Sequence, residues 1–414
     1  MGESTFVNQV NARPRTANQA RYGMDWILVS VVAGLLLFGL LMVYSAGPKF
    51  ALANNRPADY FVKRQLLWAV VGVVAAIILS RINYHIYQRL AVLMIIVTII
   101  ALIASAALGN TTLGANRSLF NGSVRPSELA KVVTIIYVGV WLTAKRDVLN
   151  DITVGLLPLI VILALNAGLI MIQPDFSAAI TVIVLGGILF FMAGGAWRQI
   201  AITLLLTVVL VWGVVNVYPT GMQRITEYIA GLHNPLDASY HVQRSLEAFI
   251  NGKLFGVGIG HGSTKFTGLP VAPTDSIFAV IAEETGLIGA GMVILAYLIL
   301  LWRGLRIAQQ APDFLGMLLA SGMSIWIAFE ALLNMAVMVN LMPQGGNALP
   351  FISYGGSSLV ATLAGVGILL NVARGSDTSK SSKGGGTFGA VVDLRWRDRR
   401  RSVSRYGHPS GPQR

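Results

Sequence analysis

The sequence of 414 residues contains no cysteine. Disulfide bonds, thiolate nucleophiles and cysteine metal sites are therefore excluded. Charged residues are also scarce: Asp, Glu, Lys and Arg make up only 12% of the chain, whereas hydrophobic residues make up 55%. Uninterrupted apolar runs recur along the chain, and many have the ~20 residues that span the hydrocarbon core of a bilayer. The sequence therefore predicts an integral membrane protein.

Apolar runs bounded by polar or Gly/Pro segments predict ten membrane helices, and hence an all-α fold. The first run follows a polar segment and is long enough to be kept as a helix, so no cleaved signal is needed. The predicted spans are roughly residues 26–45, 66–82, 88–108, 127–144, 155–172, 177–195, 199–218, 276–302, 314–340 and 350–372. The expected domains are an N-terminal tail (1–25), a ten-helix membrane domain (26–372) containing one long loop (219–274), and a basic, Gly/Ser-containing C-terminal tail (373–414).

The distribution of basic residues indicates how the chain is oriented. Of the 31 Lys and Arg residues, 10 follow Val372, where a basic tail beside the membrane favours anionic lipid headgroups over nucleic acid. An even number of spans puts both termini on one side, which carries 20 of these residues against 10 in the opposite loops. We therefore expect cytoplasmic termini and an extracytoplasmic long loop, although the basic loop at 47–65 argues the other way.

The stretch LPVAPTDSIFAVIAEETGLIG, residues 269–289, places three carboxylates at one predicted helix. Asp275 stands at the mouth of this helix, where it could cap the helix, carry chemistry, or do both. Glu283 and Glu284 lie eight and nine residues further along, roughly 12–13 Å deeper and on other faces. The three side chains therefore cannot point into one cavity. We predict that Asp275 serves chemistry and that the two Glu residues belong to polar networks inside the bundle.

A second cluster is VRPSELAKV, in which proline before Ser-Glu is typical of a helix start. Glu128 and Lys131 are three residues apart and so share one helix face. One interpretation is a neutralising ion pair inside the membrane. The other is that Lys131, with Arg117 and Arg125 nearby in sequence, binds a phosphate group.

Two Gly- or Pro-containing segments complete the candidate polar positions. LIMIQPDFSAA puts Gln173 and Asp175 at a turn between two predicted helices, which alone is ordinary turn chemistry. LMPQGGNALPFISYGGSSL places Tyr354, Ser357 and Ser358 in irregular backbone at membrane depth or its edge. Such backbone is tolerated only when it is buried in protein or lines a cavity.

The remaining polar residues give weaker signals. Glu330 and Asn334 lie one turn apart in the ninth predicted span and are best explained as packing between helices. Three of the five histidines, His233, His241 and His261, fall in the long loop. Their spacing matches no metal-binding motif, so the sequence predicts no histidine metal site.

Together these segments resemble the SEDS family of membrane glycosyltransferases, which contains the division and rod-shape polymerases FtsW and RodA. The resemblance runs from about Asp25 to Asn371. Its most specific match is LPFISYGGSSL, and the supporting matches are VYSAG, FVKRQL, RPSELAKV, QPDFS and PTDSIFAVIAEETGLIG.

The resemblance implies an activity and a set of partners. Members of the family link the disaccharide units of lipid II into glycan strands and release undecaprenyl pyrophosphate, working with a class B penicillin-binding protein in bacterial cell division or elongation. A multi-pass protein of the bacterial plasma membrane is therefore expected, with lipid II, undecaprenyl pyrophosphate, that transpeptidase and membrane lipids as partners, and no nucleic acid.

The resemblance also implies roles for individual residues. The essential carboxylate of the family corresponds to Asp275, which would act as general base or would hold a divalent cation such as Mg²⁺ or Mn²⁺. The residues expected to bind substrate or pyrophosphate are Lys131, Arg117, Arg125, Glu128, Ser357 and Ser358. The residues expected to support the site are Gln173, Asp175, Glu283, Glu284 and Tyr354.

The chain departs from the family pattern at Pro273, Ser118 and Asn340, and it reads SYHVQRS where the family has G-Y-Q-x-x-Q-S. Two other classes of function stay open at this point: a lipid II flippase or transporter, and a non-catalytic scaffold for a penicillin-binding protein. Against transport, the sequence has no inverted repeat, and Asp275 is expected at the outer surface instead of the midplane.

Overall fold

The computed structural model describes residues 25–108, 125–149, 151–199 and 219–384, together with positions 201, 203, 205 and 213. Within these ranges the chain forms helices and connecting loops, without a strand. The helices are α1 (Trp26–Ala53), α2 (Tyr60–Arg81), α3 (Ile86–Leu108), α4 (Pro126–Ala144), η1 (Arg146–Val148), η2 (Ile152–Leu156), α5 (Leu157–Ile172), α6 (Phe176–Met192), α8 (Pro219–His233), η3 (Pro235–Asp237), α9 (Tyr240–Gly252), α10 (Thr264–Thr267), α11 (Ile277–Gln309), α12 (Phe314–Met338) and α13 (Gly356–Gly384).

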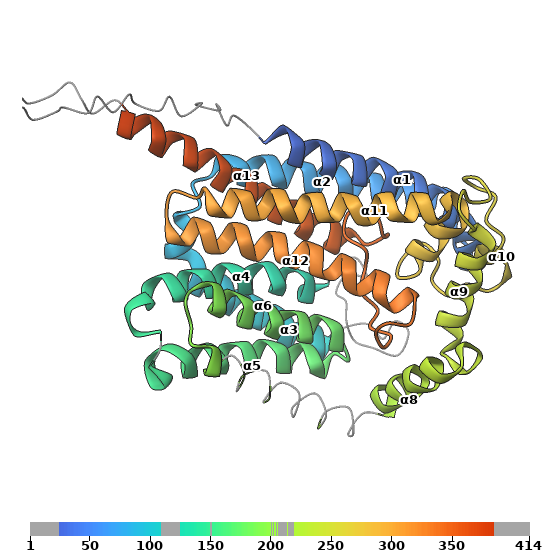
Figure 1. Cartoon of the computed structure of the whole chain (residues 1–414), viewed down its shortest axis with the longest axis horizontal. Helices are drawn as coiled ribbons and strands as arrows, with labels where there is room; N and C mark the ends of the chain where they lie inside the picture. Colours follow the sequence, from blue (N-terminus) through green and yellow to red (C-terminus); the bar gives the residue numbers. More distant parts are fainter. Residues whose placement is uncertain are drawn as a thin grey trace, which may run out of the picture.

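Eight helical segments of the described residues are long and apolar enough to cross a membrane, and α6 is a shorter apolar helix. These elements confirm the all-α membrane fold that the apolar runs predict. Of the ten predicted spans, the seventh, 199–218, lies largely outside the described residues. Figure 1 shows the long helices side by side in one bundle.

Several helices extend beyond the apolar runs that predict them. α1 continues to Ala53, α2 starts at Tyr60, and α11 continues to Gln309. Hydrophobicity marks only the part of a helix that contacts hydrocarbon, whereas backbone hydrogen bonding continues into polar sequence at both ends. The predicted span 350–372 is wrong at its start, because residues 350–355 form turns and α13 begins at Gly356.

The bundle is held by close helix pairs and by a few buried polar links. α2 packs along α13, where a Cβ on Gly367 would lie 2.6 Å from the carbonyl oxygen of Ala76. A small residue at this position therefore lets the two backbones approach closely, as is common between membrane helices. Asp25 caps α1 by accepting from the backbone N–H of Leu28 at 3.1 Å, and it pairs with Arg303 of α11 at 2.6 Å.

The long loop forms its own helical layer at one end of the bundle. Helices α8, α9 and α10 lie at the right-hand end in Figure 1, while the C-terminal end of α13 projects from the opposite end. α9 packs against α11 and α12. The long loop thus contains helices of its own, and α9 positions it against α11.

Helix α11 is broken near its beginning. Gly286 has φ 70° and ψ −174°, a combination that glycine adopts readily and other residues avoid. Four backbone hydrogen bonds of 2.9–3.2 Å join residues 283–288 to residues 253–258 and so satisfy the groups that the break exposes. The sequence did not predict this break, because a glycine inside an apolar run looks the same whether or not the helix continues through it.

Candidate functional site

A pocket beside the start of α11 brings together five of the residues singled out from the sequence: Arg125, Asp275, Tyr354, Ser357 and Ser358. The rest of its lining comes from Arg64, Trp68, Thr274, Ala348, Gly355 and Gly356. These residues belong to α2, α13 and the segments directly before α4, α11 and α13. Segments that are far apart in the sequence therefore meet at this pocket.

Asp275 lies in a turn, residues 270–276, whose backbone is fastened on several sides. The side-chain amide of Asn334 on α12 donates to the carbonyl oxygen of Asp275 at 2.9 Å and to that of Asn347 at 2.6 Å. The Ser353 hydroxyl donates to the carbonyl oxygen of Thr274 at 2.7 Å. These bonds fix the backbone that carries the carboxylate. The residue in the N-cap position of α11 is Ser276, one residue after Asp275.

The segment opposite this turn, residues 347–355, is held by α2 and α11. Gln65 donates to the carbonyl oxygen of Ser353 at 3.0 Å and accepts from the N–H of Gly355 at 3.3 Å. The Tyr297 hydroxyl of α11 donates to the carbonyl oxygen of Pro350. The irregular backbone expected here is thus buried in protein and lines a cavity, as such backbone at membrane depth must.

Both segments contain strained backbone. Val271 has φ 41° and Phe351 has φ 66°, in the left-handed region that branched and bulky residues rarely adopt. Strain of this kind costs of the order of 1–3 kcal/mol per residue and persists only where surrounding contacts over-determine the conformation. The hydrogen bonds described above are such contacts.

The electrostatics of the pocket favour an anion. Two guanidinium groups, Arg64 and Arg125, line it together with the single carboxylate of Asp275. The first turn of α13, residues 356–358, also lies in the lining. The first backbone N–H groups of a helix lack intrahelical partners and carry the positive end of its dipole. A phosphate or pyrophosphate group matches this combination of arginines and helix start.

Lys131 lies deeper, inside the bundle, and is not part of the pocket lining. Its ammonium group pairs with Glu128 at 2.8 Å and with Glu330 of α12, and only 3% of the residue is exposed. The predicted helix start at Pro126 and the shared face of Glu128 and Lys131 are confirmed. The structure favours the ion-pair interpretation, and phosphate binding by Lys131 stays a prediction.

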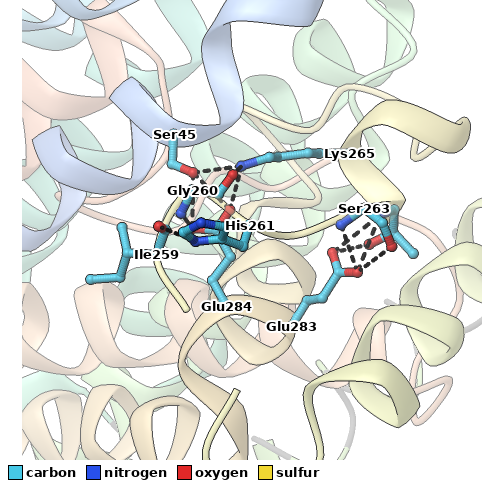
Figure 2. A network of polar contacts seen from close by, with 9 residues as sticks. Ser45, Ile259, Gly260, His261, Ser263, Lys265, Glu283 and Glu284 are labelled. Carbon is cyan, nitrogen blue, oxygen red and sulfur yellow. Dashed lines mark hydrogen bonds and ion pairs between the residues drawn. The ribbon is translucent and has the colours of Figure 1, made fainter. Parts of the chain in front are cut away.

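Glu283 and Glu284 lie in two separate networks at the far side of the α11 start. Figure 2 shows Glu283 facing Ser263 and Glu284 facing Ser45 and Lys265. Glu283 accepts from the backbone N–H groups of Ser263 at 3.0 Å and Thr264 at 3.1 Å, and from both hydroxyls. The expectation that the three carboxylates do not share one cavity is confirmed.

Glu284 forms a buried ion pair. Its carboxylate binds the Lys265 ammonium at 2.5 Å, the Ser45 hydroxyl at 2.7 Å and the backbone N–H of Gly260 at 3.0 Å (Figure 2). The Lys265 and Glu284 side chains are 2% and 0% exposed. This network therefore joins α1, the long loop and α11 at one point.

The other predicted site residues lie outside the pocket. Gln173 donates to the carbonyl oxygen of Leu102 at 2.9 Å, which ties the α5–α6 turn to α3. Asp175 caps α6 and accepts from the Ser127 hydroxyl at 3.2 Å. Their supporting role thus takes the form of helix-to-helix links near the α4 start. Arg117 lies outside the described residues.

The pocket lining supplies few of the ligands that a divalent cation needs. Within the described part of the chain, no three His, Asp or Glu side chains come together as a metal site. The pocket lining supplies one carboxylate, Asp275, and several hydroxyl groups. Mg²⁺ is commonly held by one or two carboxylates together with substrate phosphates and water. Asp275 fits such a cation only as one ligand beside a phosphate-bearing substrate.

Two residues that matter in the folded chain escape the sequence analysis. Arg64 lies in the FVKRQL segment and lines the pocket. Lys265 of the long loop lies outside the pocket, in the buried pair with Glu284. No spacing rule links either residue to a partner in a distant segment, so only the fold reveals these pairs.

Comparison with known proteins places this architecture in a family. The sequence model covering FtsW, RodA and SpoVE, described as "Cell cycle protein", matches residues 25–378. The chain belongs to the FtsW/RodA/SpoVE family. The resemblance inferred from the motifs is thereby confirmed.

Relatives of this FtsW/RodA/SpoVE chain carry consistent names. A protein of Trichlorobacter lovleyi named "Probable peptidoglycan glycosyltransferase FtsW" is 38% identical over 85% of this chain and 93% of its own length. "Stage V sporulation protein E" of Bacillus subtilis is 34% identical over 84% of this chain and 97% of its own length.

Solved structures share the fold. One described as "Structural coordination of polymerization and crosslinking by a peptidoglycan synthase complex" is 26% identical, with a TM-score of 0.70 over 86% of this chain and 98% of that chain. The rod shape determining protein RodA of Thermus thermophilus, at 24% identity, has a TM-score of 0.62 over 85% and 97% of the two chains and shows the fold alone.

Proposed function

We propose that this chain is a peptidoglycan glycosyltransferase that polymerises lipid II into glycan strands and releases undecaprenyl pyrophosphate. The family and the names of its relatives support this function. The observation that carries the proposal is the pocket in which one carboxylate, Asp275, lies with two arginines and the first turn of α13. A glycosyl transfer from a lipid pyrophosphate needs both a base and an anion site.

In the proposed reaction the 4-hydroxyl of the acceptor GlcNAc attacks the anomeric carbon of the donor. A carbon–oxygen bond forms there while the bond from that carbon to the pyrophosphate oxygen breaks. Asp275 takes the hydroxyl proton as general base, and the electron pair of the broken bond leaves with undecaprenyl pyrophosphate. The fastened backbone of the 270–276 turn supports this role, because a base must be held within hydrogen-bond reach of its proton.

The departing pyrophosphate gains negative charge in the transition state. Arg64, Arg125 and the first N–H groups of α13 supply positive charge to the pocket. Preorganised donors of this kind lower the barrier because they need no rearrangement as charge develops. Ser357 and Ser358 stand in that first turn, in keeping with the phosphate-binding role predicted for them.

A divalent cation such as Mg²⁺ or Mn²⁺ is a second way for Asp275 to act. Asp275 would be the carboxylate ligand that holds the cation, and the cation would supply positive charge to the leaving group. Addition of EDTA separates the two roles. Polymerisation that resists EDTA assigns Asp275 to proton transfer, whereas loss that Mg²⁺ or Mn²⁺ restores assigns it to the cation.

The cellular setting belongs to the same proposal. We place the chain in the bacterial plasma membrane with both termini in the cytoplasm, as the basic tail suggests, and with a class B penicillin-binding protein as its partner. The similarity to a chain of a solved peptidoglycan synthase complex supports such a partner. The Asp275 pocket would then face the extracytoplasmic side, where lipid II headgroups are used.

The experiment that tests this function compares wild type with Asp275→Asn. Each purified protein, with its penicillin-binding partner, receives fluorescent lipid II, and glycan ladders are read on gels. We expect ladders from wild type and a loss of roughly 10²–10⁴-fold in the variant, the range of a general base, with unchanged melting temperature.

The other outcomes are equally informative. Ladders from both proteins would show that Asp275 is not the catalytic carboxylate. No ladders from a folded wild-type complex would end the proposal. Lipid II flipping without polymer would then favour a transporter. Ladders from the penicillin-binding partner without this chain would instead favour a scaffold.

A further inference from the structure

A chain of three hydrogen bonds runs behind the Asp275 turn. The Gln344 side-chain amide approaches Nδ1 of His241 at 2.6 Å, and Nε2 of His241 approaches the Ser276 hydroxyl at 2.5 Å. The Ser276 hydroxyl donates to the carbonyl oxygen of Pro270 at 2.6 Å. His241 is only 4% exposed, so water does not substitute for these partners.

The donors and acceptors in this chain define the state of the imidazole. The amide nitrogen of Gln344 can only donate, so Nδ1 of His241 accepts. The single hydroxyl hydrogen of Ser276 goes to Pro270, so Nε2 of His241 carries the hydrogen and donates. A neutral imidazole protonated at Nε2 satisfies every group in the chain. An imidazolium would direct a second N–H at the amide nitrogen of Gln344.

The surroundings of His241 favour that neutral form. Burial and the positive charge of Arg224 on α8 lower the pKa of His241 to about 4. Arg224 also donates to the carbonyl oxygen of Gln344 at 3.3 Å, so it braces the same residue that faces the imidazole. The imidazole is therefore uncharged across the physiological range of pH.

The hydrogen-bond chain links α9 to two segments that line the pocket. His241 belongs to α9 of the long loop, Ser276 directly follows Asp275, and Gln344 belongs to the segment 339–355 that lines the pocket further along. The bonds from Asn334 and Ser353 hold the carbonyl oxygens of Asp275 and Thr274. The His241 chain holds Ser276, the next residue of the turn, and through it Pro270. Removing His241 therefore takes away the tie between this turn and α9.

We propose that His241 is a positioning residue for glycosyl transfer, one that locks the Asp275 turn to the long loop through Ser276 and Gln344. The inference rests on the proposed function, since it concerns the orientation of the same carboxylate. His241 does not touch the reacting atoms. It acts by keeping Asp275 within reach of the acceptor hydroxyl, where a displacement of about 1 Å can cost 10²-fold in rate.

The test compares His241→Ala with His241→Gln in the lipid II assay, using the complex with the penicillin-binding partner. Glutamine can accept from Gln344 through its oxygen and donate to Ser276 through its nitrogen, so it can rebuild the chain. We expect His241→Ala to lower kcat by roughly 10- to 100-fold with KM changed less than threefold, and His241→Gln to keep kcat within about threefold.

Two further variants keep the test decisive. His233→Ala alters an exposed histidine of α8 that, among the described residues, bonds to Ile229 of its own helix, and it should behave as wild type. Gln344→Met breaks the chain from its other end if His241→Ala fails to fold. The double variant His241→Ala with Gln344→Met should lose no more kcat than the worse single variant, because both remove one chain.

Several results would overturn the inference. Wild-type kcat in His241→Ala would do so, as would equal kcat losses in the Ala and Gln variants that follow their melting temperatures. A rise in KM alone would assign His241 to substrate binding. Ladders from wild type in the same gel show that the proposed function itself stands. Their absence would remove both the function and the reaction that His241 is inferred to assist.

Discussion

Two groups of carboxylates on either side of the α11 start have opposite surroundings. Asp275 lies in a pocket lined by Arg64 and Arg125, on a turn held through its backbone. Glu283 and Glu284 are 1% exposed, and both are surrounded by hydrogen-bond donors supplied by the chain itself. Carboxylates within one short stretch of sequence thus serve two purposes: Asp275 lines a pocket, whereas Glu283 and Glu284 hold the long loop against α11.

The difference shows how to separate chemistry from architecture in a membrane protein. Ionisable residues near the membrane are functional candidates by default. A carboxylate whose oxygens are already bonded by backbone N–H groups, hydroxyls and a buried lysine stabilises the fold. A carboxylate that lines a pocket together with two arginines lies where a substrate can reach it. Partners, more than sequence position, therefore assign the role.

The largest loss of stability is expected on substitution of Lys131. This substitution tests whether Glu128 and Lys131 of α4 stabilise the fold, as Glu283 and Glu284 do, or bind substrate, as proposed for the pocket residues. Lys131→Met would leave Glu128 and Glu330 facing each other without a cation. Breaking a buried pair in this way costs about 3–5 kcal/mol. We expect the melting temperature to fall, and Glu330→Gln in the same chain to recover part of the loss. Unchanged melting with a raised KM for lipid II would instead assign Lys131 to the phosphate site.

Lys265→Met tests the buried ion pair between Lys265 and Glu284. The change leaves Glu284 buried without its cation, so a loss of about 3 kcal/mol is expected in equilibrium unfolding, at the low end for a buried pair because Ser45 and Gly260 still donate. Lys63→Met is the matched control, since its pair with Asp59 is exposed and should leave unfolding unchanged. Equal effects of the two substitutions would show that burial does not distinguish them.

Arg64→Ala tests the pocket that contains Asp275. A charge-assisted hydrogen bond to the donor pyrophosphate contributes about 1.5–3 kcal/mol, so kcat/KM for lipid II should fall roughly 10- to 100-fold with little change in melting temperature. Arg56→Ala offers a control, because Arg56 also stacks on the Tyr60 ring but lies outside the pocket lining. A similar loss in both variants would point to the ring contact instead of the pocket.

The smallest expected effect is the dependence of stability on pH that comes from buried His241. Its folded pKa of about 4 lies below the ordinary value of 6.5, so between these values the unfolded chain binds more protons than the folded one. Stability must then fall as pH drops through this window, by about 2 kcal/mol between pH 7 and pH 5. His241→Gln should show a shallower decline in melting temperature over that range. An identical decline would assign the acid sensitivity to other groups.

Much of the fold follows from the sequence because lipid imposes a simple rule. Apolar runs of about twenty residues predict most of the spans, and Pro126 correctly marks the start of α4. The ends of helices are less predictable, as α1 and α2 show, because hydrogen bonding continues where hydrophobicity stops. The break at Gly286 also escapes prediction, since its backbone groups are satisfied by a distant segment.

The polar residues also include some that the sequence predicts and some that it does not. Asp275, Arg125, Tyr354, Ser357 and Ser358 could be predicted, because each lies in a motif and the structure brings them to one pocket. Arg64 and Lys265 could not, because their importance comes from neighbours that only the folded chain supplies. Lys131 shows the converse: its motif is recognisable, yet two carboxylates surround its charge.

The break in α11 has a mechanical consequence. Two of the four bonds to residues 253–258 of the long loop come from residues before Gly286 and two come from residues after it. The loop therefore spans the break and ties both pieces of α11 together. A force on the loop is shared between the short piece that follows Asp275 and the long piece that continues through the bundle, so the break is not a free hinge.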